Sequence, residues 1–334
     1  MTGATNRASR DRTLRLAFVS AVVSLVAVFA AVGSTIPLFN IHRAEDGFTN
    51  ADISLTVVDA APTRPAWLAS VASSQTVMLG LAVGAIASGA LVQFGPWPRD
   101  LIYVVVISVL LLTVLLIAIS PETVTRAPGG WRSLRPSVHV PARVRRLLPV
   151  AAAVFLATWA TGAFYQAFVP ALIADQLHTN NSLILGLVFA AYMGPSALGA
   201  PLAGRFTPAA AQRIGMTAFL AGWVGLITAI TTGALPLFFA ASVTAGAAQG
   251  IAISAATRGL LFGSALPDRA PTFSVVYLLS YSSATIPSLV SARLANVYSL
   301  RHIALGYGGL ALLCTLFTVV GARNPRPDTP STVS

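Results

Sequence analysis

The chain of 334 residues contains no lysine, a single cysteine and few charged residues of either sign. Charged residues make up 9% of it, whereas a soluble globular domain carries roughly 25%. The lone Cys314 excludes both a disulfide framework and a multi-thiolate metal site. Hydrophobic residues make up 55% and the mean hydropathy is +0.77, so a soluble fold would expose too much apolar surface to water. The composition therefore indicates a membrane protein.

Ionisable groups are also missing from the middle of the long apolar runs. All ten acidic residues and all four histidines lie in tails, loops or at the ends of runs. A buried acid–base pair is therefore absent, and we expect no enzyme activity, metal or cofactor. Proton-coupled carriers typically place an acidic residue or a histidine within the membrane, and this sequence shows none.

Nine apolar runs are long enough to cross a bilayer, which needs about 20 residues of helix. Their continuity favours helices over the alternating segments of a β-barrel. The first run follows four arginines and exceeds the roughly 7–15 apolar residues of a signal peptide, so we expect a retained helix. The predicted runs are 15–39, 67–93, 100–120, 147–173, 183–204, 213–233, 235–257, 272–292 and 302–321.

Arginines alternate between the loops, although the net charge of +11 alone could suggest nucleic acid. Six lie in segment 121–146, and after residue 120 the count is twelve in the segments predicted inside against two, Arg293 and Arg301, outside. This alternation is typical of the positive-inside rule rather than of a nucleic-acid surface. An alanine-rich chain without lysine is typical of a GC-rich bacterial genome, so we expect a bacterial plasma membrane.

The N-terminal part breaks this alternation. The four-arginine tail and the six-arginine loop both belong inside, yet three spans separate them. The irregularity lies in 40–66, where the apolar hexamer 53–58 stops at Asp59 and is too short to cross a bilayer. We infer that an odd number of helices is missing there. The alternative is a nine-span protein with its N-terminus outside, and a sequence artefact would give the same pattern.

Two bundles joined by a basic loop resemble the major facilitator superfamily. Residues 147–322 resemble the C-terminal six-helix bundle of that family, and 121–146 resembles its central loop. Residues 15–39 look like its first helix and 60–120 like its fifth and sixth. The resemblance implies that the second to fourth helices are absent, which agrees with the broken alternation.

Two glycine-containing segments also resemble family motifs. The cytoplasmic loop motif that follows the eighth helix corresponds to 199–206, with Gly199, Gly204 and Arg205, although Gly204 replaces the usual acidic residue. The fifth-helix signature of antiporters corresponds to 78–89, with Gly80, Gly84 and Gly89, although Ala85 stands where proline is expected. Small residues at four-residue spacing predict a helix-packing seam, and ordinary packing is the alternative to a functional one.

The predicted fold is an all-α, polytopic membrane bundle of about nine helices. Its C-terminal six-helix bundle is complete and its N-terminal bundle is partial. The expected parts are an incomplete N-terminal bundle (1–120), a cytoplasmic linker (121–146), a C-terminal bundle (147–322) and a cytoplasmic tail (323–334).

Polar side chains inside the apolar runs are the candidates for a solute cavity. Gln166 and Tyr165 lie in run 147–173, Tyr192 in run 183–204 and Gln249 in run 235–257. An amide in hydrocarbon must find a partner or face a wet cavity. Each amide therefore either contacts solute or forms an interhelical hydrogen bond. The tyrosines, with Tyr277 and Tyr281, either face the cavity or pack as interfacial anchors.

The resemblance implies a secondary transporter of a small organic solute, in the direction of efflux or antiport, embedded in the lipid bilayer. A half-complete bundle predicts impaired transport, since alternating access requires two bundles rocking around a central site. The alternative is a truncated membrane protein that does not transport and at most binds a partner.

Overall fold

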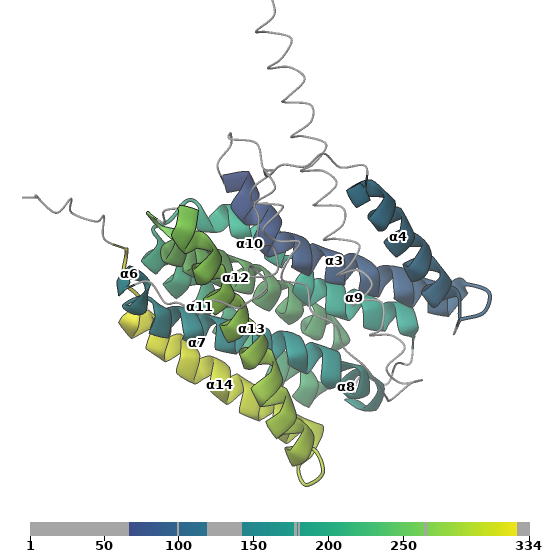
Figure 1. The fold of residues 1–334 in the computed structure, drawn as a ribbon. Coiled ribbons are helices and arrows are strands. Elements are labelled where there is room, and N and C mark those ends of the chain that lie inside the picture. The colour runs from purple at the N-terminus through teal and green to yellow at the C-terminus, as the bar shows by residue number, and fades with distance from the viewer. Residues whose placement is uncertain are drawn as a thin grey trace, which may run out of the picture.

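The computed structural model describes residues 67–98, 100–118, 142–176, 179, 181–263 and 266–325 (Figure 1). The predicted first span, 15–39, and the segment 40–66 with its inferred gap lie outside the described residues. So does most of the linker 121–146.

All regular structure in the described ranges is helical. Seven helical segments are long and apolar enough to cross a membrane, and a shorter apolar one covers Leu101–Leu115. The helices are α3 (Trp67–Phe94), α4 (Leu101–Ala118), α6 (Ala142–Arg145), α7 (Leu148–Ala167), α8 (Val169–Gln176), α9 (Ser182–Met193), α10 (Ser196–Ala203), α11 (Pro208–Thr232), α12 (Leu235–Leu261), α13 (Leu266–Leu294) and α14 (Leu300–Gly321). Eight of the nine predicted runs thus fall on described helices.

Two predicted runs are broken helices, and a proline lies at each break. Pro170 follows the end of α7 and has no N–H to donate to the carbonyl of Gln166. Pro195 lies between α9 and α10 and has none to donate to the carbonyl of Ala191. The chain resumes helical structure within two or three residues, and α9 with α10 is together long enough to cross a membrane, whereas α7 alone has that length.

A tight hairpin joins α11 and α12. Gly233 ends α11 with a left-handed φ of 70°, a conformation that glycine adopts without strain. Along the hairpin the backbones lie close together, because a Cβ on Gly222 would meet the Ala245 backbone N at 2.8 Å. A Cβ on Gly215 would likewise meet the Ala252 backbone N at 2.8 Å. Small residues thus let these two helices approach along most of their length.

Helix α12 lies at the centre of the C-terminal helices and packs against α7, α9, α10 and α11. Helix α7 also carries α13 and α14, and α3 packs along α9 and α10 (Figure 1). The largest fully buried side chains, which include Trp223, Tyr165 and Tyr192, all come from α7 to α12. The core therefore lies inside the C-terminal bundle, with α3 as its neighbour.

The arginines separate between the two ends of the bundle. Arg213 donates from Nε to the Val319 carbonyl (3.0 Å) and from Nη2 to the Ala322 carbonyl (2.9 Å), so it caps α14. Arg146 and Arg323 line one small cavity at that same end. Arg293 and Arg301 lie at the other end, beside the α13–α14 turn. This separation agrees with the loop alternation seen in the sequence.

Candidate functional site

Three of the four predicted cavity residues meet inside the C-terminal bundle. The rings of Tyr165 (α7) and Tyr192 (α9) stack with centroids 4.3 Å apart and an interplanar angle of 11°. The Tyr165 hydroxyl lies 2.6 Å from Ser242 Oγ of α12, and the Tyr192 hydroxyl donates to the Thr158 carbonyl at 3.0 Å. Gln249 Nε2 lies 3.5 Å from the Tyr192 carbonyl. These side chains therefore join α7, α9 and α12.

This cluster is sealed from its surroundings in the described conformation. Tyr165 and Tyr192 are fully buried, and Gln249 is 1% exposed. Each polar atom named above has a protein partner, which is what burial in an apolar medium requires. Contact of these three residues with a solute stays a prediction, and their geometry here is that of interhelical packing.

Gln166 lies on a different face of α7. It belongs to a half-buried stripe that follows the helical repeat and consists of Ala152, Leu156, Trp159, Ala163 and Gln166, hereafter the α7 stripe. One helical residue turns the side chain by about 100°, so Tyr165 enters the core while its neighbour Gln166 does not. Because Pro170 cannot donate to the Gln166 carbonyl, this residue presents both amide and carbonyl groups near the helix end.

A line of aromatic residues on α13 lies beside Trp159 of this stripe. Phe273, Tyr277 and Tyr281 recur every four residues, and successive rings stack at centroid distances of 6.4 and 6.3 Å. We refer to these three residues as the α13 aromatic ladder. Trp159 meets its last ring edge-on, with centroids 5.6 Å apart and an angle of 62°. Tyr281 is 38% exposed, so the ladder is open to its surroundings rather than sealed.

The sequence left open whether Tyr277 and Tyr281 face the cavity or pack as interfacial anchors, and it did not single out Trp159. Aromatic residues at i, i+4 and i+8 are the signal that groups the ladder on one helix face. Trp159 lies seven residues before Gln166, which is about two helical turns, and the same reasoning places it on the face of Gln166. These spacings define the candidate functional site as the α7 stripe with the α13 aromatic ladder.

Of the predicted small-residue seam on α3, Gly89 lies against α9. A Cβ on Gly89 would meet the Ser182 carbonyl oxygen at 2.6 Å. On the facing helix, a Cβ on Gly186 would collide with the Ala85 carbonyl oxygen. Gly80 and Gly84 are buried one to two turns earlier on α3. Backbone contact between α3 and α9 therefore runs through Gly89, Ala85 and Gly186.

The predicted loop motif forms the end of α10 and the turn after it. Gly199 lies against α12, where a Cβ would collide with the Ala247 carbonyl oxygen. Gly204 and Arg205 are exposed in the turn. The sequence had not predicted a role for Arg258, whose Nη2 donates to the carbonyls of Ala203 (2.9 Å) and Phe206 (2.6 Å). This arginine fastens the motif to the end of α12.

Comparison with known proteins gives a structural match. No protein-family model and no curated protein matches the sequence. The structure is similar to the crystal structure of a bacterial homologue of the human lysosomal transporter Spinster, in an inward-facing and occupied conformation. The TM-score is 0.51 at 14% sequence identity, and the match covers 92% of this chain and 84% of that chain.

At this identity the likeness establishes the fold alone. The described chain is helical throughout, and its seven apolar helices are long enough to cross a membrane. The described residues therefore form an all-α, polytopic helical bundle that shares its fold with this solved transporter homologue, and seven of its helical segments have the length and apolar composition of membrane spans.

Proposed function

We propose that this protein is a secondary transporter that moves a small organic solute out of a bacterial cell. The observation that carries the proposal is the contact of Trp159 in the α7 stripe with Tyr281, the exposed end of the α13 aromatic ladder. The fold, shared with a solved transporter homologue, supports it.

The chemistry of the site favours a solute with a flat, apolar body and a hydrogen-bonding group. The α7 stripe contains no charged side chain, and its only polar groups are the Gln166 amide and the Trp159 indole N–H. Tyrosine and tryptophan rings bind aromatic and cationic groups through their faces. Gln166 supplies a donor and an acceptor that orient the solute.

The other predicted residues have supporting roles in this proposal. Tyr165, Tyr192 and Gln249 lie behind the α7 stripe and fix α7 relative to α9 and α12. The α3–α9 seam, with Gly89 at its end, is the contact along which the N-terminal helices move. A bundle that lacks its second to fourth helices would rock slowly, so we expect a low turnover number.

A flux assay with a fluorescent aromatic cation tests the proposal. Purified protein is reconstituted into vesicles loaded with ethidium, and release is followed through the fluorescence gained on binding external DNA. We expect release faster than from protein-free vesicles. Equal rates would show that the chain does not transport this probe, and the same result across a panel of aromatic probes would favour the non-transporting alternative.

Matched variants locate the transport site. Gln166→Ala and Tyr277→Ala should each slow ethidium release about 10-fold, the effect of losing roughly 1.4 kcal/mol of binding in the transport step. Leu278→Ala is the control, because Leu278 neighbours Tyr277 on α13 but is 55% exposed away from the ladder. Equal loss in Tyr277→Ala and Leu278→Ala would point to damage of α13 rather than of a site.

The membrane orientation has a separate test. We propose that the end of the bundle with Arg213 and Arg258 faces the cytoplasm. In a Cys314→Ala background, Tyr298→Cys at the α13–α14 turn should react with an impermeant maleimide in intact cells, whereas Phe206→Cys should not. Both native residues are exposed, at 52% and 44%. The opposite labelling pattern would invert the proposed orientation.

A further inference from the structure

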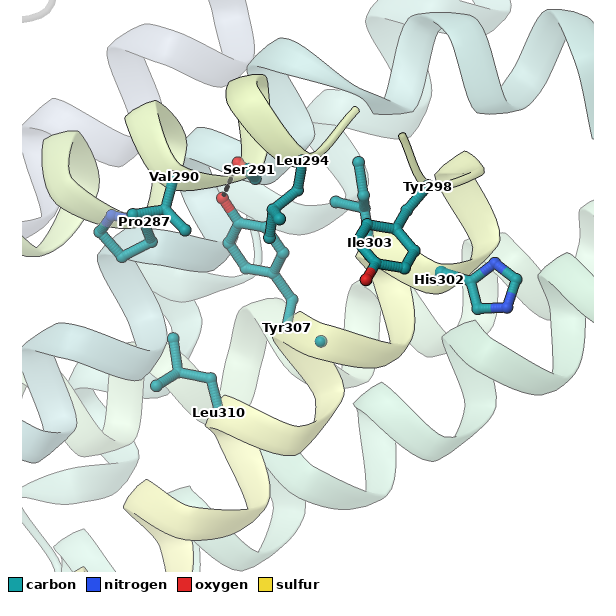
Figure 2. Close-up of a pocket in the computed structure, with 10 residues that line it drawn as sticks. Pro287, Val290, Ser291, Leu294, Tyr298, His302, Ile303, Tyr307 and Leu310 are labelled. Carbon is teal, nitrogen blue, oxygen red and sulfur yellow. Dashed lines mark hydrogen bonds between the residues drawn. The ribbon is translucent and has the colours of Figure 1, made fainter. Parts of the chain in front are cut away.

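An open cavity lies between the C-terminal part of α13 and the N-terminal part of α14. A cavity of about 510 Å³ separates the two helices, within the roughly 300–1,000 Å³ typical of ligand pockets. Its wall is mostly apolar, and Figure 2 shows the side chains around the space. The lining residues that matter here are Val290, Ser291, Tyr298, His302, Gly306 and Tyr307.

Three polar side chains on the wall of this cavity, Ser291, Tyr307 and His302, have hydrogen-bond partners within the protein. The Ser291 and Tyr307 hydroxyls lie 3.0 Å apart, and Ser299 Oγ lies 2.7 Å from His302 Nδ1 (the first pair is dashed in Figure 2). A polar solute would therefore find few unused partners on the wall. An alkyl chain needs none, so the interior suits hydrocarbon.

The position of the cavity places it at the boundary of the membrane. The α13 span ends at Leu294 and the α14 span begins at Leu300, and the lining residues extend to both sides of this turn. Val290 and Leu294, which line the cavity, are also 54% and 43% exposed. The cavity is thus open sideways towards the acyl chains of one leaflet.

The α13–α14 turn beside the cavity carries positive charge. Arg293 and Arg301 are exposed at the two helix ends that border the α13–α14 turn. The sequence contains no acidic residue between Asp268 and Asp328 to neutralise them. Basic residues between helix ends at the membrane surface attract anionic lipid headgroups.

We propose that this cavity binds an anionic membrane lipid, with one acyl chain between α13 and α14 and the headgroup near Arg293 and Arg301. The lipid fills the space that the diverging helices leave and stabilises an otherwise weakly packed hairpin. The site lies beyond the candidate transport site and does not depend on the proposed transport.

Photolabelling in vesicles tests this proposal without a transport assay. The full chain is reconstituted in phosphatidylcholine vesicles that contain a small fraction of phosphatidylglycerol with a diazirine on its acyl chain. After illumination, we expect label on peptides from the C-terminal part of α13 and the N-terminal part of α14. Label found only on other peptides would overturn the proposal.

Two glycines on α14 provide a matched pair of variants. A Cβ at Gly306, which lines the cavity, meets nothing within 4 Å, and the same holds for Gly309, which does not line it. Gly306→Leu should fill the cavity without a clash and lower labelling at least threefold. Gly309→Leu should leave labelling unchanged. Equal labelling in both variants would place the lipid outside the cavity.

The headgroup preference has its own test. In the same vesicles, the phosphatidylglycerol probe should label the cavity several-fold more than a phosphatidylcholine probe with the same diazirine. The double variant Arg293→Gln/Arg301→Gln should bring the two probes to equal labelling. A wild-type protein that labels equally with both probes would overturn the anionic assignment.

Discussion

Helices α12 and α13 follow each other in the chain and are both apolar, yet they are packed in opposite ways. Buried residues make up 56% of an 18-residue apolar stretch of α12 and 17% of the corresponding stretch of α13. On α12, Gly246 and Gly250 lie against the backbone of Tyr192 and Ser196, and a Cβ on either would collide with it. Helix α13 is attached to α7 through side chains, including the Trp159–Tyr281 ring contact.

The difference shows that apolar character alone does not decide what a membrane helix contacts. Lipid tails are as apolar as leucine, so helix association depends on close packing and polar contacts rather than on hydrophobicity. Helix α12 has the small residues that permit backbone contact on several sides. Helix α13 presents Leu278, Ile286 and Leu289 outward. Contact with lipid tails is as favourable for these side chains as contact with protein.

The largest expected effect comes from enlarging a glycine on α12. Gly250→Leu should destabilise the protein by about 3 kcal/mol or more, because its side chain would collide with the Ser196 carbonyl in a rigid core. The measurement is the monodisperse fraction after heating in detergent. Gly309→Leu on α14 is the control, since its Cβ meets nothing within 4 Å. Equal thermal stability of the two variants would contradict the close backbone packing of α12.

A smaller loss is expected at the end of α12. Arg258→Gln removes two charge-assisted hydrogen bonds to the α10 turn and should cost about 2 kcal/mol. Arg293→Gln at the end of α13 should change stability by less than about 0.5 kcal/mol, since that residue is exposed. Both values come from the same thermal assay. A larger loss at Arg293 would contradict the contrast between the helix ends.

The attachment of α13 can be measured as a pairwise coupling. A double-mutant cycle with Trp159→Leu and Tyr281→Leu should give a coupling of about 1 kcal/mol, the size of an edge-on aromatic contact. A coupling near zero would mean that α13 is attached to α7 by its other contacts.

The smallest effect is expected on the outward face of α13. Leu289 is 64% exposed, so Leu289→Ala should change the free energy of unfolding by less than about 0.5 kcal/mol. Ile253→Ala on α12 should cost about 2–5 kcal/mol, because Ile253 is 6% exposed. A loss above about 1 kcal/mol at Leu289 would show that another segment or molecule covers α13.

The sequence predicted helix existence well because hydropathy and bilayer thickness fix span length. Runs 67–93 and 100–120 correspond to α3 at 67–94 and α4 at 101–118. The run predicted from 213 begins instead at Pro208, where Thr207 caps the helix by accepting from the Ala210 N–H. Local capping chemistry of this kind is invisible to a hydropathy window.

The direction in which each side chain points was less predictable from the sequence than the position of the spans. The sequence placed Tyr165 and Gln166 together as cavity candidates, but the helical turn between them separates a core residue from a stripe residue. Arg258 was counted only as a charge, and its capping of α10 depends on a fold in which residues 50 positions apart meet. Such long-range partners cannot be read from apolar periodicity.

The α3–α9 seam has a consequence for the order of synthesis. Gln93 Oε1 accepts from the Ser182 N–H, so α3 finds this partner 89 residues later in the chain. At about 5–20 residues per second, the ribosome needs about 4–18 s to make that stretch. During this interval the face of α3 that carries Ala82, Ala85 and Gly89 has no α9 to cover it. These three residues are small and apolar, so the polar side chain of that face that waits for its partner in α9 is Gln93, at the end of the helix.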